Sequence, residues 1–225
     1  MIAAILVVLV LLFLTPLFYF LPNAVLAAVV VVAVMGLVDI KEARHLFHLK
    51  RIDGWTLLAT FAGTLVLGSI QGILLGVVLS LLVFIRRSAY PRVIALGYLE
   101  KEDVFRNLQR FPDARVYPGV LLLRVDSSLY FANLEFVRDL LQKKVAEKPE
   151  IRRVIIDLSS VNDIDGPAID ALEDIMSRYA GRGIRFLFAG MKGPVRDLVA
   201  RAGWEEKYGE AFRYPSLQQA LKSIR

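Results

Sequence analysis

The chain contains no cysteine and only two histidines in 225 residues. Without cysteine it can form no disulfide, no thiolate nucleophile and no zinc–sulfur site. Residues that are charged at neutral pH are also missing from the long apolar runs before Arg86. Sites of transport or proton transfer inside a membrane normally need such a residue. These runs therefore predict spanning or packing helices without a chemical site of their own.

A dense basic run is missing as well, although the net charge is +6. Six basic residues precede Ser88 and cluster at the ends of apolar runs, as expected for the cytoplasmic flanks of membrane helices. The remaining 22 basic residues are balanced by 19 acidic ones. This balance argues against a nucleic-acid partner. No grouping of side chains suggests an enzyme, a metal site or a cofactor.

What the sequence does contain is a change of composition at Arg86-Arg87. Long apolar runs precede it, whereas strand-length apolar segments alternate with charged, helix-patterned segments after it. We therefore expect membrane helices over residues 1–87, a connector over residues 88–114 and a soluble domain over residues 115–225.

The apolar runs predict how the first part crosses a bilayer. Residues 2–21 are long enough to span about 30 Å of hydrocarbon as a helix, and residues 24–38 form a second run. Residues 55–85 lie between two basic flanks, so we expect them to cross an even number of times. A turn at residues 68–72 would give two arms of about 13 residues. The alternative is one tilted helix of about 30 residues.

The second part alternates strands and helices. Apolar segments of strand length occur at residues 120–125, 129–131, 153–158 and 184–189. Helices are expected at residues 133–147, with Asn133 as the cap, and after Asp165, Lys192 and Ser216. A polar helix is also expected at residues 100–110, inside the connector. This order predicts an α/β domain with a small, mostly parallel sheet faced by helices.

The clearest motif runs from Asp157 to Ala168, between an expected strand and the next helix. Asp165 is placed to cap that helix, and Pro167 suits its first turn. Asp157, Asp163 and Asp165 could be interpreted as metal ligands, but no further ligands accompany them, so we favour structural roles. A strand-to-helix loop of this kind is where α/β domains usually present a site.

This motif resembles the signature of STAS domains, the fold of bacterial anti-sigma-factor antagonists. Residues 117–133 resemble the start of the STAS domain in SulP-type anion transporters, the family related to the SLC26 transporters. Residues 14–28 and 71–80 resemble the last membrane helices of the same family. The chain is thus similar to the C-terminal part of a SulP transporter along essentially its whole length.

The resemblance implies secondary transport of an inorganic anion such as sulfate or bicarbonate by the whole protein. Members of the family have about fourteen membrane segments in two inverted repeats, and this chain corresponds to the part from about the eleventh segment onward. The half-helices that hold the anion would lie outside it, so we expect no substrate-binding residue and no transport by this chain alone. The expected partners are the lipid bilayer and either the remaining helices or a second copy in a homodimer.

For the STAS domain the resemblance implies a cytoplasmic position beneath a multi-pass cell-membrane protein, and a role in regulation and in dimer or protein contacts. The expected partner surface is the motif loop, with Asp157, Ser159, Asp163, Asp165, Gly166 and Pro167. In sigma-regulatory STAS proteins a serine two positions after the aspartate is phosphorylated. Pro167 stands there and has no hydroxyl, so we expect no phosphorylation at this position. The alternative interpretation is a membrane-tethered STAS signalling or scaffold protein that transports nothing.

Overall fold

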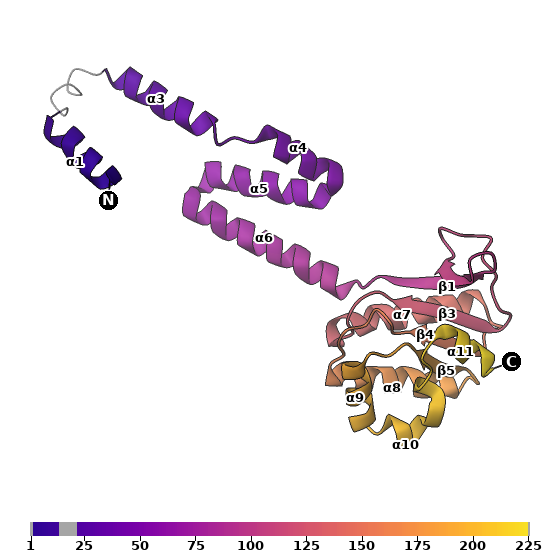
Figure 1. Cartoon of the computed structure of the whole chain (residues 1–225). Coiled ribbons are helices and arrows are strands. Elements are labelled where there is room, and N and C mark those ends of the chain that lie inside the picture. The colour runs from indigo at the N-terminus through magenta and orange to yellow at the C-terminus, as the bar shows by residue number, and fades with distance from the viewer. Residues whose placement is uncertain (1, 14–21, 225) are drawn as a thin grey trace. The chain divides into compact units, whose positions relative to one another are not determined.

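The computed structural model describes residues 2–13 and 22–224 of the chain (Figure 1). The chain divides into two compact units, Met1–Ser80 and Leu81–Arg225. The first, here called the helical unit, consists of helices, and the second, the sheet unit, is built on a five-stranded sheet.

The helical unit contains five helices among its described residues: α1 (Ile2–Phe13), α3 (Asn23–Met35), α4 (Ile40–Leu49), α5 (Arg51–Leu67) and most of α6 (Ser69–Ala89). α1 follows the first apolar run, and the remainder of that expected span, residues 14–21, lies outside the described residues. α3 follows the second apolar run and buries none of its side chains.

α5 and α6 form a hairpin. Gly68 joins them with φ +97°, a backbone conformation that favours glycine. The helices touch at small residues: a Cβ at Gly72 would lie 2.4 Å from the Cα of Thr64. A turn within the predicted residues 68–72 is confirmed, but it is limited to Gly68 because α6 begins at Ser69, and the alternative of one continuous helix is wrong. The arms, of 17 and 21 residues, are longer than expected, because α5 begins at Arg51 in the polar flank and α6 continues past Arg87.

α4 is the polar segment before α5. Asp39 caps it by accepting the N–H of Glu42 at 2.9 Å. The ring of Phe47 meets Trp55 edge-on, with 5.9 Å between centroids. Gly54 makes room for that ring, since a Cβ there would lie 2.6 Å from it. One face of α4 therefore packs on the start of α5.

The sheet unit has the strand order β2-β1-β3-β4-β5. Its strands are β1 (Val93–Leu99), β2 (Val104–Asn107), β3 (Val120–Val125), β4 (Arg153–Asp157) and β5 (Arg185–Ala189). β3, β4 and β5 run parallel, as predicted. β1 is antiparallel to both β2 and β3, so the sheet is mixed rather than mostly parallel.

Residues 88–114, expected to be a connector, supply the hairpin of β1 and β2. The polar helix expected at residues 100–110 is wrong, because residues 104–107 form an edge strand. Asp103 turns the hairpin at φ +54°, and its carboxylate accepts the Tyr98 hydroxyl at 2.6 Å and the Gln218 amide at 2.8 Å. Four residues are too few to distinguish the period of a strand from that of a helix.

The helices of the sheet unit are α7 (Phe131–Glu147), α8 (Gly166–Ala180), α9 (Gly193–Arg201), α10 (Trp204–Tyr208), the short 3₁₀ helix η1 (Gly209–Phe212) and α11 (Leu217–Lys222). α8, α9 and α11 confirm predicted helices. α7 begins before Asn133, which is not the cap but accepts the backbone N–H of Tyr130 at 3.1 Å. The strand expected at residues 129–131 is reduced to a bridge between Leu129 and Ile164.

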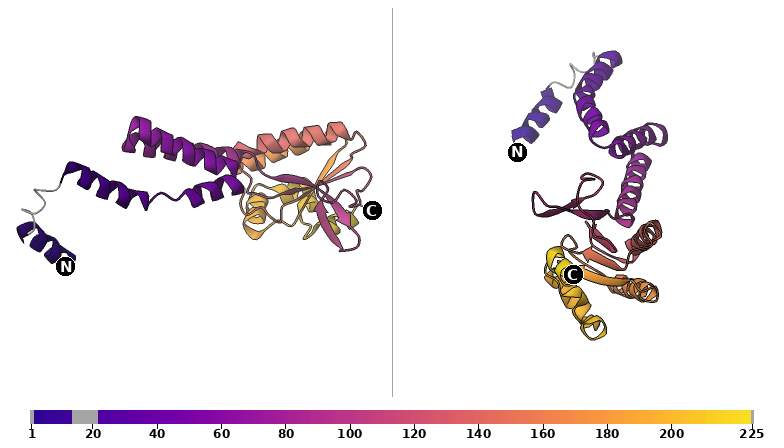
Figure 2. Two further views of the ribbon diagram at one scale, coloured as in Figure 1. Left: turned by 90° about the horizontal axis from the view of Figure 1, so that it is seen from above. Right: turned by 90° about the vertical axis from the view of Figure 1, so that its right-hand side faces the viewer.

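α7 and α8 cover one face of the sheet, and α11 lies on the other (Figure 2). The larger core lies beneath α7, α8 and α9 and includes Leu123, Ile156 and Phe188. Trp204 closes it from α10, with no exposed surface and its ring 5.4 Å from that of Phe188. Within residues 22–224, the Trp204 indole N–H is buried without a hydrogen-bond partner.

Candidate functional site

The motif loop begins at Asp157, the last residue of β4. Its Oδ1 accepts the N–H of Ser159 at 2.9 Å, and the Ser159 side chain is exposed. The end of β5 passes close by at Gly190, where φ is +72° and a Cβ would lie 3.0 Å from Asp157 Oδ1. The positive φ and this close approach together favour glycine at residue 190.

Asp165 binds the first turns of two helices. Its Oδ1 accepts the N–H of Ala168 at 2.8 Å, which caps α8 and confirms the predicted role. Its Oδ2 accepts the N–H of Phe131, the first residue of α7, at 3.2 Å. A carboxylate here complements the unpaired N–H groups and the positive dipole ends of both helices. Sequence reasoning missed the second bond because it joins residues 34 positions apart.

The middle of the loop is fastened to Leu129. Leu129 donates its N–H to the carbonyl of Asp163 at 3.0 Å and accepts the N–H of Asp165 at 3.2 Å. The Asp163 carboxylate accepts the neighbouring N–H of Ile164 at 2.9 Å. All three aspartates of the motif thus bind backbone N–H groups. The described residues contain no group of three side chains suited to a metal.

The start of α7 also contacts the last turn of α6 within the sheet unit. The Ser88 hydroxyl lies 2.5 Å from the Tyr130 hydroxyl. The Tyr90 ring meets Phe136 edge-on, with 5.6 Å between centroids. The chain therefore enters the sheet unit beside the same helix terminus that Asp165 binds.

Gly166 and Pro167 are exposed on the first turn of α8. A Cβ at Gly166 would meet nothing within 4 Å, so this glycine is not required by packing. Beside them the Phe131 ring is 69% exposed. Phe131 and Pro167 line a hollow of about 130 Å³ between α7 and α8, together with charged side chains of both signs: Glu135, Arg138, Asp174 and Arg178. A mixture of exposed apolar and charged side chains is compatible with a protein contact surface.

The structure therefore divides the predicted site into two ends. Asp157 and Ser159 lie beside the end of β5, whereas Asp165, Gly166 and Pro167 lie where α7 and α8 begin. Asp163 ties the loop between them to Leu129. Sequence reasoning missed Phe131 because it was assigned to a short strand.

Comparison with known proteins decides the family. Residues 1–60 match the sulfate permease family, and residues 111–220 match the STAS domain. Sulfate transporter 1.2 of Arabidopsis thaliana is 38% identical over 231 residues, which cover 99% of this chain and 35% of that protein. Probable sulfate transporter 4.2 of the same plant is 36% identical over 94% of this chain and 33% of its own length. The chain belongs to the sulfate permease (SulP/SLC26) family.

A solved SLC26 structure shows the same fold. Murine solute carrier 26 family member A9, an anion transporter in the inward-facing state, aligns with a TM-score of 0.75 and 25% identity over 90% of this chain and 33% of its own. This SulP/SLC26 chain thus spans about a third of the length of the relatives that it matches. Its STAS domain lies in the sheet unit, and β1 and β2 precede the matched residues 111–220.

Proposed function

We propose that this chain is the C-terminal portion of a SulP-type secondary anion transporter. The observation that carries the proposal is the order of the two matches, sulfate permease over residues 1–60 and STAS over residues 111–220. The relatives named as sulfate transporters support sulfate or a similar inorganic anion as the substrate of the whole protein. The chain spans about a third of those relatives. We therefore infer that the anion-binding residues belong to the rest of the transporter and that this chain alone does not transport.

The surface of the helical unit supports a multi-pass position in the cell membrane. Its helices expose large apolar side chains along their length, a surface suited to hydrocarbon rather than water. Two segments are long and apolar enough to cross a membrane, Asn23–Leu49, which includes the turn into α4, and Ser69–Ala89. Basic residues flank the α5–α6 hairpin, with Arg51 at its start and Arg86 and Arg87 near its end. This flanking charge favours a cytoplasmic position for both ends of the hairpin and for the STAS domain.

We infer that the STAS domain acts in regulation through dimer or partner contacts. The contact surface would be the motif loop together with the hollow between α7 and α8. Asp165 orders this surface by binding both helices, and Phe131 and Pro167 supply exposed apolar side chains to it. Pro167 has no hydroxyl, so phosphorylation at that position cannot regulate the contact.

Uptake of radiolabelled sulfate by cells that lack their own uptake system tests the transport proposal. The chain alone should give no saturable uptake above the empty vector. A chimera in which this chain replaces the corresponding third of Arabidopsis sulfate transporter 1.2 should restore uptake, with the intact plant transporter as the control. Saturable uptake by the 225-residue chain alone would overturn the proposal. A chimera that reaches the membrane but never transports would favour the signalling or scaffold alternative.

Single-cysteine variants test the placement, because the natural chain has no thiol. Ser159→Cys puts one thiol on the exposed motif loop. In intact cells a membrane-impermeant maleimide should leave it unlabelled, and labelling should appear once the membrane is opened. Labelling in intact cells would refute a cytoplasmic STAS domain.

A further inference from the structure

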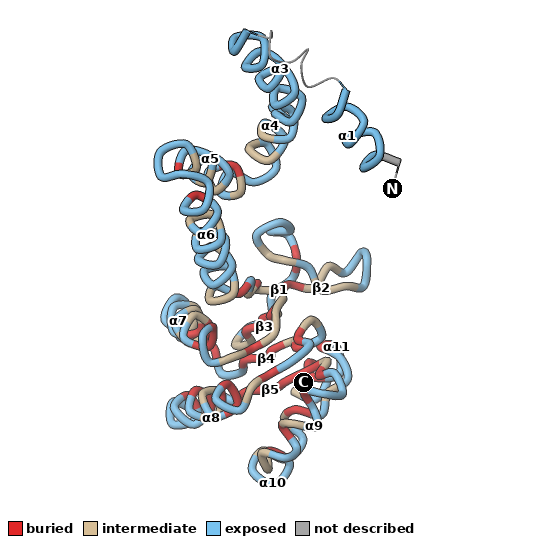
Figure 3. Tube along the Cα trace, turned by 90° about the vertical axis from the view of Figure 1, so that its left-hand side faces the viewer, coloured by how far each residue is buried: buried red, intermediate tan, exposed pale blue. Residues whose placement is uncertain are grey.

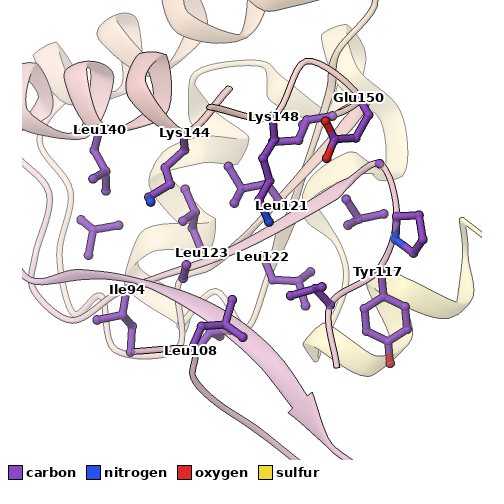
Figure 4. A pocket seen from close by; sticks show the side chains of 18 of the residues that line it. Ile94, Leu108, Tyr117, Leu121, Leu122, Leu123, Leu140, Lys144, Lys148 and Glu150 are labelled. Carbon is purple, nitrogen blue, oxygen red and sulfur yellow. The ribbon is translucent and has the colours of Figure 1, made fainter. Parts of the chain in front are cut away.

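A cavity of about 500 Å³ opens in the sheet unit where β1 separates from β3 (Figure 4). The register between the two strands covers residues 93–95 of β1 and 123–125 of β3. From Leu96 onward β1 pairs with β2, and Tyr98 bonds to the chain at Arg115. The two strands diverge from this point, and the first residues of β3 border the opening.

The walls of this cavity are mainly apolar. They include Leu121 and Leu123 of β3, Ile94 of β1, Leu108 just after β2, and Leu140 of α7. Its volume falls within the range of about 300–1,000 Å³ that small-molecule sites occupy. The lining can therefore remove a long hydrocarbon chain from water.

Two lysines lie at the rim above these leucines. Lys144 lies in the last turn of α7 and Lys148 directly follows this helix, and Figure 4 shows both side chains pointing towards the leucines of β3. Lys144 Nζ lies 2.9 Å from Glu147, and this hydrogen bond is the main cause of the lowered pKa of the Glu147 carboxyl. Among the described residues that line the cavity, Glu150 alone is acidic. The two lysines outnumber this carboxylate in the lining, which favours an anionic group, and such a group would replace Glu147 as the partner of Lys144.

We propose that this cavity binds a free fatty acid, with its carboxylate between Lys144 and Lys148 and its acyl chain along the leucines. An ammonium pair matches a carboxylate through charge-assisted hydrogen bonds. A small hydrated anion such as sulfate would leave the apolar walls empty, and a neutral hydrocarbon would gain no charge interaction with the two lysines. The site is separate from the motif loop, and its test does not depend on transport by the chain.

Photocrosslinking on the full chain in nanodiscs tests the site. The probe is dodecanoic acid with a diazirine at the end of its chain, and its methyl ester is the uncharged control. A phosphatidylcholine carrying the same diazirine chain distinguishes free acid from bilayer lipid. The variants are K144Q, K148Q and the double variant. K143Q is the matched control, because Lys143 lies on the same helix, is exposed and does not line the cavity.

The acid should label peptides that contain residues 93–96 and 120–123, and the double variant should reduce this labelling by about tenfold, as expected from two partly exposed charge pairs. K143Q should leave labelling unchanged, and the ester should label these peptides weakly. Equal labelling by acid and ester, or an equal loss in K143Q, would overturn the proposal. Labelling confined to residues 2–80 would show partition into the bilayer and no site. Stronger labelling by the phospholipid would replace the free acid with a membrane lipid.

Discussion

The helical unit is almost entirely exposed, whereas much of the sheet unit is buried (Figure 3). The two units also bury opposite kinds of residue. In the helical unit, the described residues classed as buried are glycines, Gly54, Gly63 and Gly72, whereas leucine and valine side chains lie outside. In the sheet unit many large side chains are fully buried, and Trp204 and Phe188 are the largest of them. The same apolar residue types therefore serve as surface in one unit and as core in the other.

This difference shows what holds each unit together. Close backbone approach at small residues associates helices where the surroundings are as apolar as the side chains. Removal of large apolar side chains from water stabilises a sheet domain. Substitutions that add volume should therefore damage the helical unit, and substitutions that remove volume should damage the sheet unit.

The two tryptophans give the largest expected contrast. Trp204→Ala should cost the sheet unit about 3–5 kcal/mol, because it empties a fully buried site. Trp55→Ala is the matched change in the helical unit, where the ring is 63% exposed, and should leave the sheet unit unaltered. Hydrogen exchange of peptides from β4 and β5 measures both. Equal protection in the two variants would contradict the assigned core.

Adding one methyl group at a buried glycine should destabilise the helical unit, the opposite of the tryptophan pair, in which the sheet unit is the one affected. Gly72→Ala should destabilise the α5–α6 hairpin by about 1–3 kcal/mol, since the new Cβ would lie 2.4 Å from the Thr64 Cα. Gly36→Ala is the control, because the nearest atom there lies at 3.6 Å. Thermal loss of helicity in detergent measures the effect. A melting temperature that falls as much for Gly36→Ala would reject close packing at Gly72.

The two capping aspartates allow a smaller comparison. Asp39 caps α4 through one bond, whereas Asp165 binds the starts of both α7 and α8. A cap is worth about 1 kcal/mol, so Asp165→Ala should cost roughly twice as much as Asp39→Ala. Denaturant unfolding of the full chain gives the free energies. Asp165→Asn should retain part of the unfolding free energy that Asp165→Ala loses. If it retains none, the charge of the carboxylate, rather than its hydrogen bonds, stabilises the two helix starts.

Alkaline pH should weaken the sheet unit at two places on α8: the Tyr179 ring, which packs against Phe186 of β5, and the Glu173 carboxylate, which binds Lys207 of α10. Burial is the largest cause of the raised pKa of Tyr179, and the hydrogen bond to Glu173 is the largest cause of the raised pKa of Lys207. A group whose pKa is higher in the folded than in the unfolded state stabilises the fold fully at a pH below its unfolded pKa. This contribution to the unfolding free energy is lost as the pH rises through the folded pKa. Unfolding free energy should therefore decline above about pH 10. Tyr179→Phe should reduce the decline. An unchanged dependence of the unfolding free energy on pH would show that ionisation of Tyr179 does not cause it.

The sequence was sufficient where one local pattern decided the structure. Asp165 followed by Pro167 predicted the start of α8, and the structure has Asp165 as the cap and Pro167 in the first turn of that helix. The turn at Gly68 was equally visible from the glycines and polar residues that interrupt an apolar run. In each case the deciding residues are neighbours in the chain.

Features that depend on distant residues were beyond prediction. β2 is recognisable only beside β1, because its four residues carry no clear period. The bond from Asp165 to Phe131 requires that α7 and α8 start side by side. The cavity arises because β1 leaves β3 for β2, which no segment encodes alone.

The two hydrogen bonds that Asp165 accepts connect the motif loop to the start of α7 as well as to α8. The Asp165 carboxylate binds the N–H of Phe131, and the adjacent Tyr130 binds Ser88 through its hydroxyl. Two hydrogen bonds and one stretch of backbone thus link residue 165 to the last turn of α6. If the loop moves away from α7, either one of these bonds breaks or Ser88 is pulled with it. Movement of the motif loop is therefore coupled to movement of the point at which the chain enters the sheet unit.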